Sequence, residues 1–298
     1  MSAREYRDTL DGRLSSQTVK LVATPSEYDE LLPSARIITG FEIDAEAVDR
    51  AANLELFACT FAGTDHLPLS AFEANDVQVT NASGVHGPNA AEQVLASVLS
   101  FARGLDHGWA QSQAGTWSHY QADELYGSTV TVVGMGSIGG AIIDRLAPFG
   151  VETIGVRNSP SKGGDADTVV GIEQLPEILP RTDYLVLACP LTEETTQLVD
   201  TAALERLPPD SVVVNIARGQ VVDTDALHAA LQTNELRGAA LDVTDPEPLP
   251  DDPPLWSHNN CLITPHNAGH TPRYWDRMSD LIAEHVDRLE TDEPRRNP

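Results

Sequence analysis

The stretch TVTVVGMGSIGG, residues 129–140, decides the fold of this chain. A short apolar run predicts a buried strand, and the glycines after it have the G-x-G-x-x-G spacing that opens a helix. In this pattern the first glycine allows a tight turn, the second lets the backbone approach a pyrophosphate and the third permits close packing of helix on strand. Amides at the helix start face the phosphates. The predicted dinucleotide contacts here are Gly134, Gly136, Ser137, Ile138 and Gly139.

Apolar runs alternate with amphipathic stretches on the carboxyl side of this motif, in the order expected of repeated βαβ units. Short buried strands with helices between them describe a doubly wound parallel sheet. We predict strands at 129–134, 151–156, 183–189, 211–217, 238–243 and 261–265, and helices at 137–149, 172–179, 200–207 and 224–234.

The first ninety residues repeat this alternation on a smaller scale, with predicted strands at 19–24, 35–40, 54–60 and 77–81. A helix over 90–103 leads out of this region, and an amphipathic helix over 273–289 is free to return to it. We therefore expect an α/β protein with two Rossmann-like doubly wound parallel-sheet domains. Residues 1–92, completed by 273–298, form the substrate-binding domain, and residues 93–272 form the dinucleotide-binding domain.

Charge is the outlying feature of the composition, because 45 acidic residues against 19 basic ones give a formal net charge of −26. Lys20 and Lys162 are the only lysines. Such a surface disfavours nucleic-acid binding. It repels itself in dilute buffer, whereas at molar salt the Debye length falls to ~3 Å. The composition therefore predicts a halophilic protein.

The amino terminus is polar where a secretory signal needs an apolar core, and no stretch approaches the ~20 apolar residues of a membrane span. These features predict a cytoplasmic protein without a membrane partner. Cys59, Cys189 and Cys261 each lie in an apolar run and are interpreted as reduced core residues. His266 and His270 have an i, i+4 spacing, but Pro265 and Gly269 predict a loop there and no third ligand follows, so we expect no metal site.

The end of the second strand of the dinucleotide-binding region bears on which dinucleotide fits. An acid at this point would bind the ribose 2′-hydroxyl of NAD, but the chain has none there. Arg157 can pair with a 2′-phosphate, and Asn158 and Ser159 can donate hydrogen bonds to it. We predict that NADP(H) is preferred, while NAD(H) stays possible because one basic residue does not exclude it.

Three polar residues follow separate predicted strands at the edge where doubly wound sheets bind ligands. Arg218 follows the strand at 211–217, Glu247 lies after the strand at 238–243, and His266 follows the last strand. Each of them alone is compatible with a structural role. Their joint placement favours a catalytic group.

These segments, with the glycine motif and CPLTEET at 189–195, resemble the D-2-hydroxyacid dehydrogenase family. The similarity extends to NASG at 81–84 and Ala91-Glu92, and more loosely to Ala62-Gly63. The resemblance implies two Rossmann-like domains with an active-site cleft between them. It also implies hydride transfer from a nicotinamide to the carbonyl carbon of a 2-keto acid.

In that reaction His266 is the candidate general acid and, in the oxidative direction, the base. An ionised Glu247 would favour the imidazolium and hold the ring in one orientation. Arg218 would bind the substrate carboxylate and polarise the ketone. The resemblance also implies substrate contacts from Ala62, Gly63, His86 and Tyr274. Further implied cofactor contacts are Cys189, Pro190, Thr195, Ala217, Asp242, His266, Ala268 and Gly269.

Several functions stay open at this point. The first is a reversible NADP(H)-preferring D-2-hydroxyacid dehydrogenase acting on a small-molecule 2-keto or 2-hydroxy acid. The second is a glyoxylate or hydroxypyruvate reductase of the same family; a phosphoglycerate specialist is weakened because the chain ends soon after the last helix. The third is a dinucleotide-sensing, corepressor-like binding protein. The resemblance implies a homodimer, with residues 105–126 as the interface.

Overall fold

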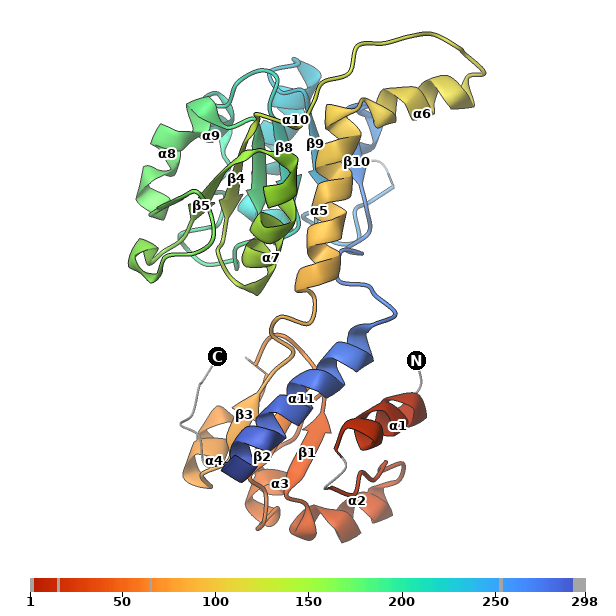
Figure 1. Cartoon of the computed structure of the whole chain (residues 1–298), viewed down its shortest axis with the longest axis vertical. Helices are drawn as coiled ribbons and strands as arrows, with labels where there is room; N and C mark the ends of the chain where they lie inside the picture. The colour runs from red at the N-terminus through yellow and green to blue at the C-terminus, as the bar shows by residue number, and fades with distance from the viewer. Residues whose placement is uncertain (1–2, 15–16, 65, 252–253, 292–298) are drawn as a thin grey trace. The chain divides into compact units, whose positions relative to one another are not determined.

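The computed structural model of the chain describes residues 3–14, 17–64, 66–251 and 254–291. The contacts divide it into two compact units (Figure 1). The first contains the residues up to His86 together with those from Thr271 onward, and the second runs from Gly87 to His270. The sequence had placed these boundaries at 92/93 and 272/273. Each unit is described by itself below.

The second unit is built on a parallel sheet in which, among the described residues, seven strands follow the order β10-β9-β8-β7-β4-β5-β6. All six predicted strands are present. The additional strand, β6, is three residues long, which is too short to carry a periodic pattern. The strands are β4 Thr129–Val133, β5 Glu152–Val156, β6 Thr168–Val170, β7 Tyr184–Leu187, β8 Val212–Asn215, β9 Gly238–Leu241 and β10 Cys261–Ile263.

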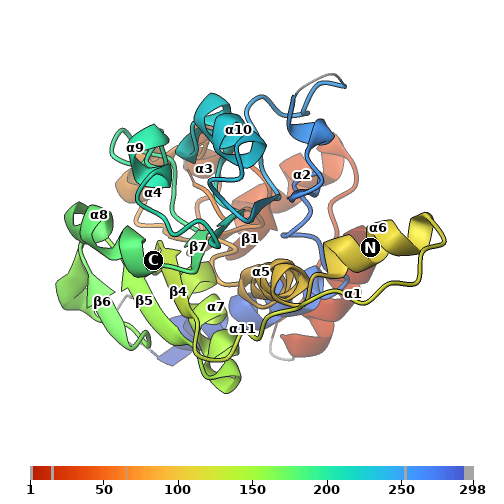
Figure 2. The same ribbon diagram turned by 90° about the horizontal axis from the view of Figure 1, so that it is seen from above.

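Helices cover both faces of this sheet (Figure 2). On one side lie α5 (Gly87–Ala102) and α7 (Ser137–Leu146), and on the other lie α8 (Leu175–Ile178), α9 (Thr201–Leu204) and α10 (Thr224–Gln232). Alternate residues of a strand point to opposite faces, so that each central strand contributes to two separate apolar cores. Single turns of 3₁₀ helix connect some elements, at Leu32–Ser34, Ala147–Phe149, Pro160–Lys162, Ile172–Gln174, Leu179–Arg181, Gly219–Val221 and Pro254–Ser257.

The predicted glycine turn joins β4 to α7. A Cβ atom on Gly139 would lie 1.9 Å from the Gly134 carbonyl oxygen, so no side chain fits there. Gly134 has φ of 101°, and a Cβ atom on it would lie 2.6 Å from the carbonyl oxygen of Ala188 after β7. These two glycines therefore set how closely α7 and the β7 loop approach the end of β4.

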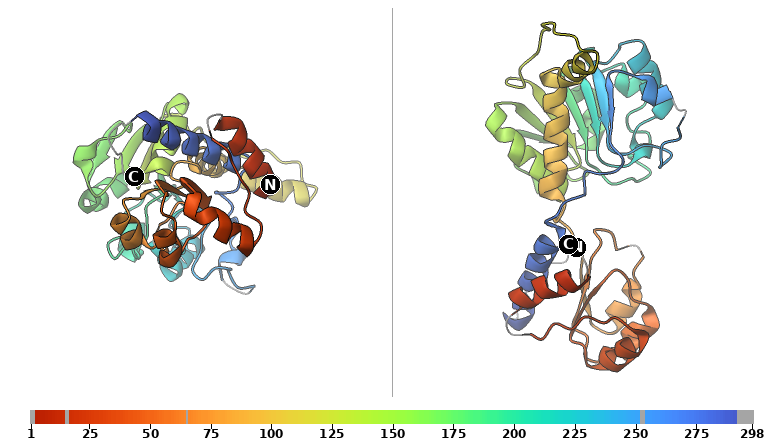
Figure 3. Two further views of the ribbon diagram at one scale, coloured as in Figure 1. Left: turned by 90° about the horizontal axis from the view of Figure 1, so that it is seen from below. Right: turned by 90° about the vertical axis from the view of Figure 1, so that its right-hand side faces the viewer.

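The first unit contains a smaller parallel sheet in the order β1-β2-β3, with β1 at Ile37–Gly40, β2 at Leu56–Cys59 and β3 at Gln78–Thr80. One face packs against α3 (Ala45–Arg50) and α4 (Leu69–Ala74), and the other against α1 (Ala3–Arg13) and α11 (Tyr274–Thr291) (right panel of Figure 3). In β2, Leu56 and Ala58 face one core while Phe57 and Cys59 face the other. The helix predicted at 273–289 thus completes this unit.

The strand predicted at 19–24 was wrong. The described residues from Gln17 onward reach α2 (Pro25–Leu31) without joining the sheet, and β1 is left as its edge strand. The physical reason is that side chains take up backbone amides of this segment. The Val19 amide donates to an Asp11 carboxylate oxygen at 3.4 Å, and the Ala23 amide donates to Glu27 Oε2 at 3.0 Å.

The described residues contain no helix that is both long and apolar enough to cross a membrane.

Candidate active site

The second unit has a pocket of about 280 Å³ at the point where the strand order of its sheet reverses. Strand β4 pairs with β5 on one side and with β7 on the other. The chain therefore leaves the carboxyl ends of β4 and β7 toward opposite sides, which opens a crevice between the two loops. The pocket lies where doubly wound sheets bind dinucleotides.

Eight of the predicted cofactor contacts line this pocket: Gly134, Gly136, Arg157, Asn158, Ser159, Cys189, Pro190 and Thr195. The remaining predicted contacts lie outside its lining: Ser137, Ile138, Gly139, Ala217, Asp242, His266, Ala268 and Gly269. Sequence reasoning missed Lys162, Met135, Thr192 and Glu194, which also line it. For Lys162 a signal existed, because Gly163-Gly164 after it allows the sharp turn that returns the chain toward β5.

The pocket is suited to an anionic ligand that lies directly against the protein backbone. A Cβ atom on Gly136, which precedes α7, would meet no atom within 4 Å, so that this backbone borders open space. Arg157 and Lys162 bring positive charge, and Arg157 Nη1 donates to the Gly163 carbonyl at 2.5 Å. The predicted phosphate donor Asn158 instead donates to Glu194 Oε2 at 3.2 Å.

The loop after β7 forms a firm wall of the pocket. The Thr192 amide donates to Thr195 Oγ1 at 2.8 Å, and this hydroxyl donates to the Pro190 carbonyl at 2.7 Å. Burial raises the pKa of the Cys189 thiol to about 11. Cys189 is therefore a neutral apolar contact of the pocket rather than a thiolate nucleophile.

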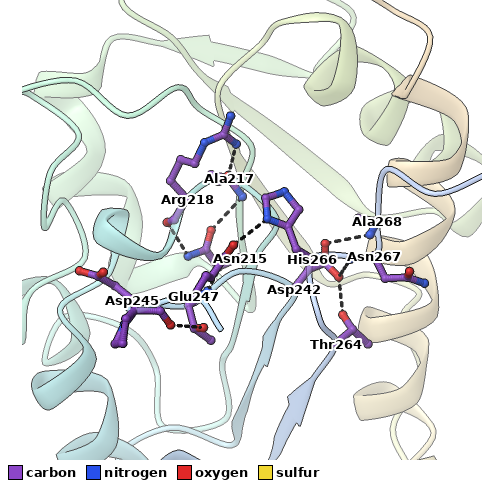
Figure 4. Close-up of polar contacts among 12 residues, drawn as sticks. Asn215, Ala217, Arg218, Asp242, Asp245, Glu247, Thr264, His266, Asn267 and Ala268 are labelled. Carbon is purple, nitrogen blue, oxygen red and sulfur yellow. Dashed lines mark hydrogen bonds and ion pairs between the residues drawn. The ribbon is translucent and has the colours of Figure 1, made fainter. Parts of the chain in front are cut away.

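The second unit also brings together His266 and Glu247 (Figure 4). His266 Nδ1 lies 2.8 Å from Glu247 Oε2, and Glu247 Oε1 accepts a hydrogen bond from the Thr244 amide at 3.0 Å. The His266 side chain is 53% exposed, so that Nε2 can meet a substrate while Glu247 fixes the ring. The pair can therefore deliver a proton from a defined direction.

A buried carboxylate holds the loop that carries His266. Asp242, at the end of β9, is 4% exposed and accepts hydrogen bonds from the amides of Asn267 and Ala268, both at 2.8 Å, and from Thr264 Oγ1 at 2.5 Å. The His266 amide donates to the Asp242 carbonyl at 2.7 Å. His266 has φ of 51°, a left-handed conformation that costs a non-glycine residue of order 1–3 kcal/mol. Asp242, predicted as a cofactor contact, has its carboxylate engaged within the protein.

Arg218 lies just beyond β8 on a loop that is tied in two ways. Asn215 accepts from the Ala217 amide and donates to the Arg218 carbonyl, both at 3.0 Å. A Cβ atom on Gly219 would lie 2.0 Å from the Thr244 carbonyl, so this loop packs directly on the loop that leads to Glu247. The Arg218 side chain is exposed, and its guanidinium donates to the Ala217 carbonyl. A planar cation is thus presented at the same sheet edge as His266 (Figure 4).

The predicted substrate residues of the first unit also lie near one another. The Tyr274 hydroxyl donates to the Thr60 carbonyl, and the Tyr274 ring lies 5.2 Å from that of His86. Thr60 leads into the exposed Ala62-Gly63 segment, whose Ala62 carbonyl accepts from Asn81 at 2.6 Å. Burial raises the pKa of Tyr274, which keeps its hydroxyl a donor. The described residues contain no group of three or more His, Cys, Asp or Glu side chains placed to hold a metal ion.

Comparison with known proteins identifies related chains. Residues 95–268 match the family model for the NAD-binding domain of the D-isomer specific 2-hydroxyacid dehydrogenases. The chain is 33% identical over 251 residues to human glyoxylate reductase/hydroxypyruvate reductase, covering 82% of this chain and 76% of that protein. It is 34% identical over 269 residues to a D-3-phosphoglycerate dehydrogenase of Mycobacterium tuberculosis, covering 90% of this chain but 50% of that longer protein.

The fold is also similar to solved structures. A D-isomer specific 2-hydroxyacid dehydrogenase from Xanthobacter autotrophicus Py2, in complex with NADPH and MES, has a TM-score of 0.77 and 28% identity. The match covers 99% of this chain and 94% of that one.

The Asp242 interaction predicts a specific loss of stability. In Asp242→Asn one carboxylate oxygen becomes an NH₂ group, which cannot accept from a loop amide, and an unsatisfied buried donor costs about 1–3 kcal/mol. We expect the Tm to fall by about 2–4 °C for each kcal/mol lost. Thermal unfolding checks this, with Asp245→Asn as the control because an amide oxygen there still accepts from Gln220. Equal Tm values for both variants and the unmodified protein would contradict the role of Asp242.

Proposed function

Because the chain belongs to the D-isomer specific 2-hydroxyacid dehydrogenase family, we propose that it reversibly reduces 2-keto acids to D-2-hydroxy acids, with NADP(H) as the preferred cofactor. The observation that carries this proposal is the 2.8 Å contact between His266 Nδ1 and Glu247 Oε2. His266 lies on the loop that Asp242 holds. A proton donor in a fixed orientation is what reduction of a ketone requires besides a hydride.

The pocket at the end of β4 suits a dinucleotide, because the backbone at Gly136 borders open space and Arg157 and Lys162 bring positive charge to its lining. When bound, the nicotinamide supplies the hydride. Arg218 pairs with the substrate carboxylate and polarises the carbonyl oxygen. His266 protonates that oxygen from Nε2 as it gains negative charge, and the Glu247 carboxylate holds the ring in position through Nδ1. In the oxidative direction His266 Nε2 accepts the hydroxyl proton.

The relatives favour one narrower alternative, a glyoxylate or hydroxypyruvate reductase, since a protein with that name aligns with most of this chain. The phosphoglycerate dehydrogenases are weaker guides to the substrate, because the chain spans half of their length. A corepressor-like dinucleotide sensor would keep the same site residues. It differs from an enzyme in binding dinucleotide without turnover.

The catalytic proposal predicts a large effect at His266. His266→Ala removes the proton donor and should lower kcat by about 10²- to 10⁴-fold, while dinucleotide affinity is unchanged. Absorbance of the reduced nicotinamide, followed in molar salt with 2-keto acids of increasing chain length, measures the rate. His270→Ala, on the same loop, is the matched control and should retain activity. If no 2-keto acid is reduced although dinucleotide binds, the sensing function replaces the enzymatic one.

The preference for NADP(H) rests on the end of β5. No acid follows Val156 to bind a ribose 2′-hydroxyl, and Arg157, Ser159 and Lys162 line the pocket there. A 2′-phosphate would gain charge-assisted hydrogen bonds from both cations. Glu194 also lines the pocket. Its carboxylate accepts a hydrogen bond from the neutral side chain of Asn158.

This preference predicts a selective loss. Arg157→Ala and Lys162→Ala should each lower kcat/KM for NADPH by about tenfold, the effect of losing one charge-assisted hydrogen bond, and leave kcat/KM for NADH nearly unchanged. Initial rates with each cofactor measure this. Lys20→Ala removes the other lysine without touching the pocket and serves as the control. A loss that is equal for the two cofactors would contradict 2′-phosphate recognition.

We also propose a homodimer formed through residues 105–126. Helix α6 (Leu105–Gln113) has no buried residue, and Trp109 and Trp117 are 69% and 96% exposed. Residues 105–126 are nevertheless held in place. The Tyr120 ring packs against Gly104 and Gly108, and Asp123 pairs with Arg237 at 2.6 Å. Large aromatic side chains on an ordered surface are typical of an interface.

The dimer predicts that Trp109→Glu and Trp117→Glu shift the protein toward monomer. Light scattering during gel filtration measures the mass, and Trp256→Glu, at another exposed tryptophan, should leave the dimer intact. A monomeric unmodified protein in molar salt would refute the proposal. The halophilic character is tested on the same samples, since lowering the salt to about 0.1 M restores repulsion among the acids over ~10 Å and should lower the Tm.

A further inference from the structure

A second cavity, of about 630 Å³, lies in the first unit and has no role in the function proposed above. Its lining comes from α1, from residues 17–22, from α2 and β1, and from Trp275 at the start of α11 (Figure 1). Ala62, Gly63, His86 and Tyr274, the predicted substrate contacts of this unit, do not line it. Its volume is within the 300–1,000 Å³ range of small-molecule sites.

The cavity exists because the segment before α2 does not pair with the sheet. Each residue of β1 is only half-buried, whereas each residue of β2 is fully buried. Residues 17–22 pass beside this edge strand and leave a space between themselves and β1. The space is therefore bordered by sheet on one side and by a loop on the other.

Most of the lining is apolar. Ile37 and Ile38 of β1 face side chains of α1 and α2, and aromatic rings complete the surface. Such a lining favours the chain of an apolar ligand, at about 0.8 kcal/mol for each buried CH₂ group. Among the apolar and aromatic lining residues are Tyr6, Leu10, Leu14, Tyr28, Leu31 and Trp275.

The charged part of the lining is entirely basic. Arg7, Lys20 and Arg36 line the cavity and no aspartate or glutamate among the described residues does, although acids outnumber bases 45 to 19 in the chain. Chance placement would put about three acids among a lining of this size. The two lysines of the chain are thus divided between the two pockets, with Lys162 in one and Lys20 in the other.

Two of these cations have hydrogen-bonding capacity to offer a ligand. Arg36 is paired with Glu55 at 2.9 Å. Lys20, in contrast, forms no ion pair with any described residue. Arg7 contacts Asp8 through Nη2 at 2.6 Å, but its Nε is buried and has no hydrogen-bond partner within the described part of the chain. Lys20 is therefore the cation of this lining that is open to an anionic ligand, and Arg7 adds a second positive charge.

We propose that this cavity binds an amphipathic carboxylate, a single carboxylate at the end of an apolar chain. The carboxylate pairs with Lys20, with the positive charge of Arg7 in the same lining, and the chain lies among the leucine and isoleucine side chains. A small inorganic anion would leave the apolar lining in contact with water, and a neutral apolar molecule would leave both cations unused. The site does not depend on the dinucleotide, so that it can be tested apart from catalysis.

Titration calorimetry with octanoate, in molar KCl and without dinucleotide, tests this proposal. The unmodified protein should bind one octanoate saturably, and saturating octanoate should raise the Tm because a ligand that binds only the folded state stabilises it. Octanol has the same chain without the charge and should bind at least tenfold more weakly. Acetate has the charge without the chain and should give no saturable binding.

Matched variants identify the cavity as the site. Lys20→Met should weaken octanoate binding about tenfold, whereas Lys162→Met, the same change in the other pocket, should leave it unaltered. Arg7→Gln removes the second positive charge of the lining and should also weaken binding, whereas Arg4→Gln, at an exposed position of the same helix, should not. Absence of saturable octanoate binding, equal affinities for octanol and octanoate, or equal effects within either pair of variants would overturn the proposal.

Discussion

The carboxylate of Asp242 is the interaction on which the proposed chemistry most depends. It is buried at the end of β9 and accepts three hydrogen bonds from the segment that follows β10. Those bonds offset the desolvation of the charge, and they fix the backbone on both sides of His266. A residue with φ of 51° would otherwise relax to a commoner conformation. The direction in which the imidazole meets Glu247 is thus set by a residue whose two carboxylate oxygens are both engaged within the protein.

This role could not be predicted from the sequence, whereas half of the predicted cofactor contacts line the pocket, and the placement of Arg218, Glu247 and His266 at one sheet edge was also predicted. Gly134 and Gly139 could be predicted from their spacing. A Cβ atom at either position would lie too close to backbone atoms of this turn. Arg218, Glu247 and His266 follow predicted strands whose carboxyl ends share one edge. An aspartate at a strand end, however, has the same sequence signature whether it binds a ligand or its own chain. Only the positions of the Asn267 and Ala268 amides distinguish the two roles.

The segment at 19–24 is the opposite case, where a local pattern was clear and the outcome differed. Its alternating apolar residues are typical of a strand, but pairing also requires the backbone amides to be available. Asp11 and Glu27 accept from amides in this region, and they are two of the many acids of the chain. Periodicity reports which side chains prefer burial, and it carries no information on competition for the backbone. The same outcome leaves the cavity beside β1.

In a chain with a net charge of −26, the positions of the few cations bear on where an anionic ligand can bind. In molar salt the Debye length is about 3 Å, so that long-range attraction of an anionic ligand is screened and direct contacts alone select it. A cation then affects binding only where it lines the site. Arg157 and Lys162 satisfy this condition beside β5, and Arg7 and Lys20 satisfy it beside β1. The two lysines of the chain therefore each line a pocket, where an anionic ligand would give each of them a partner.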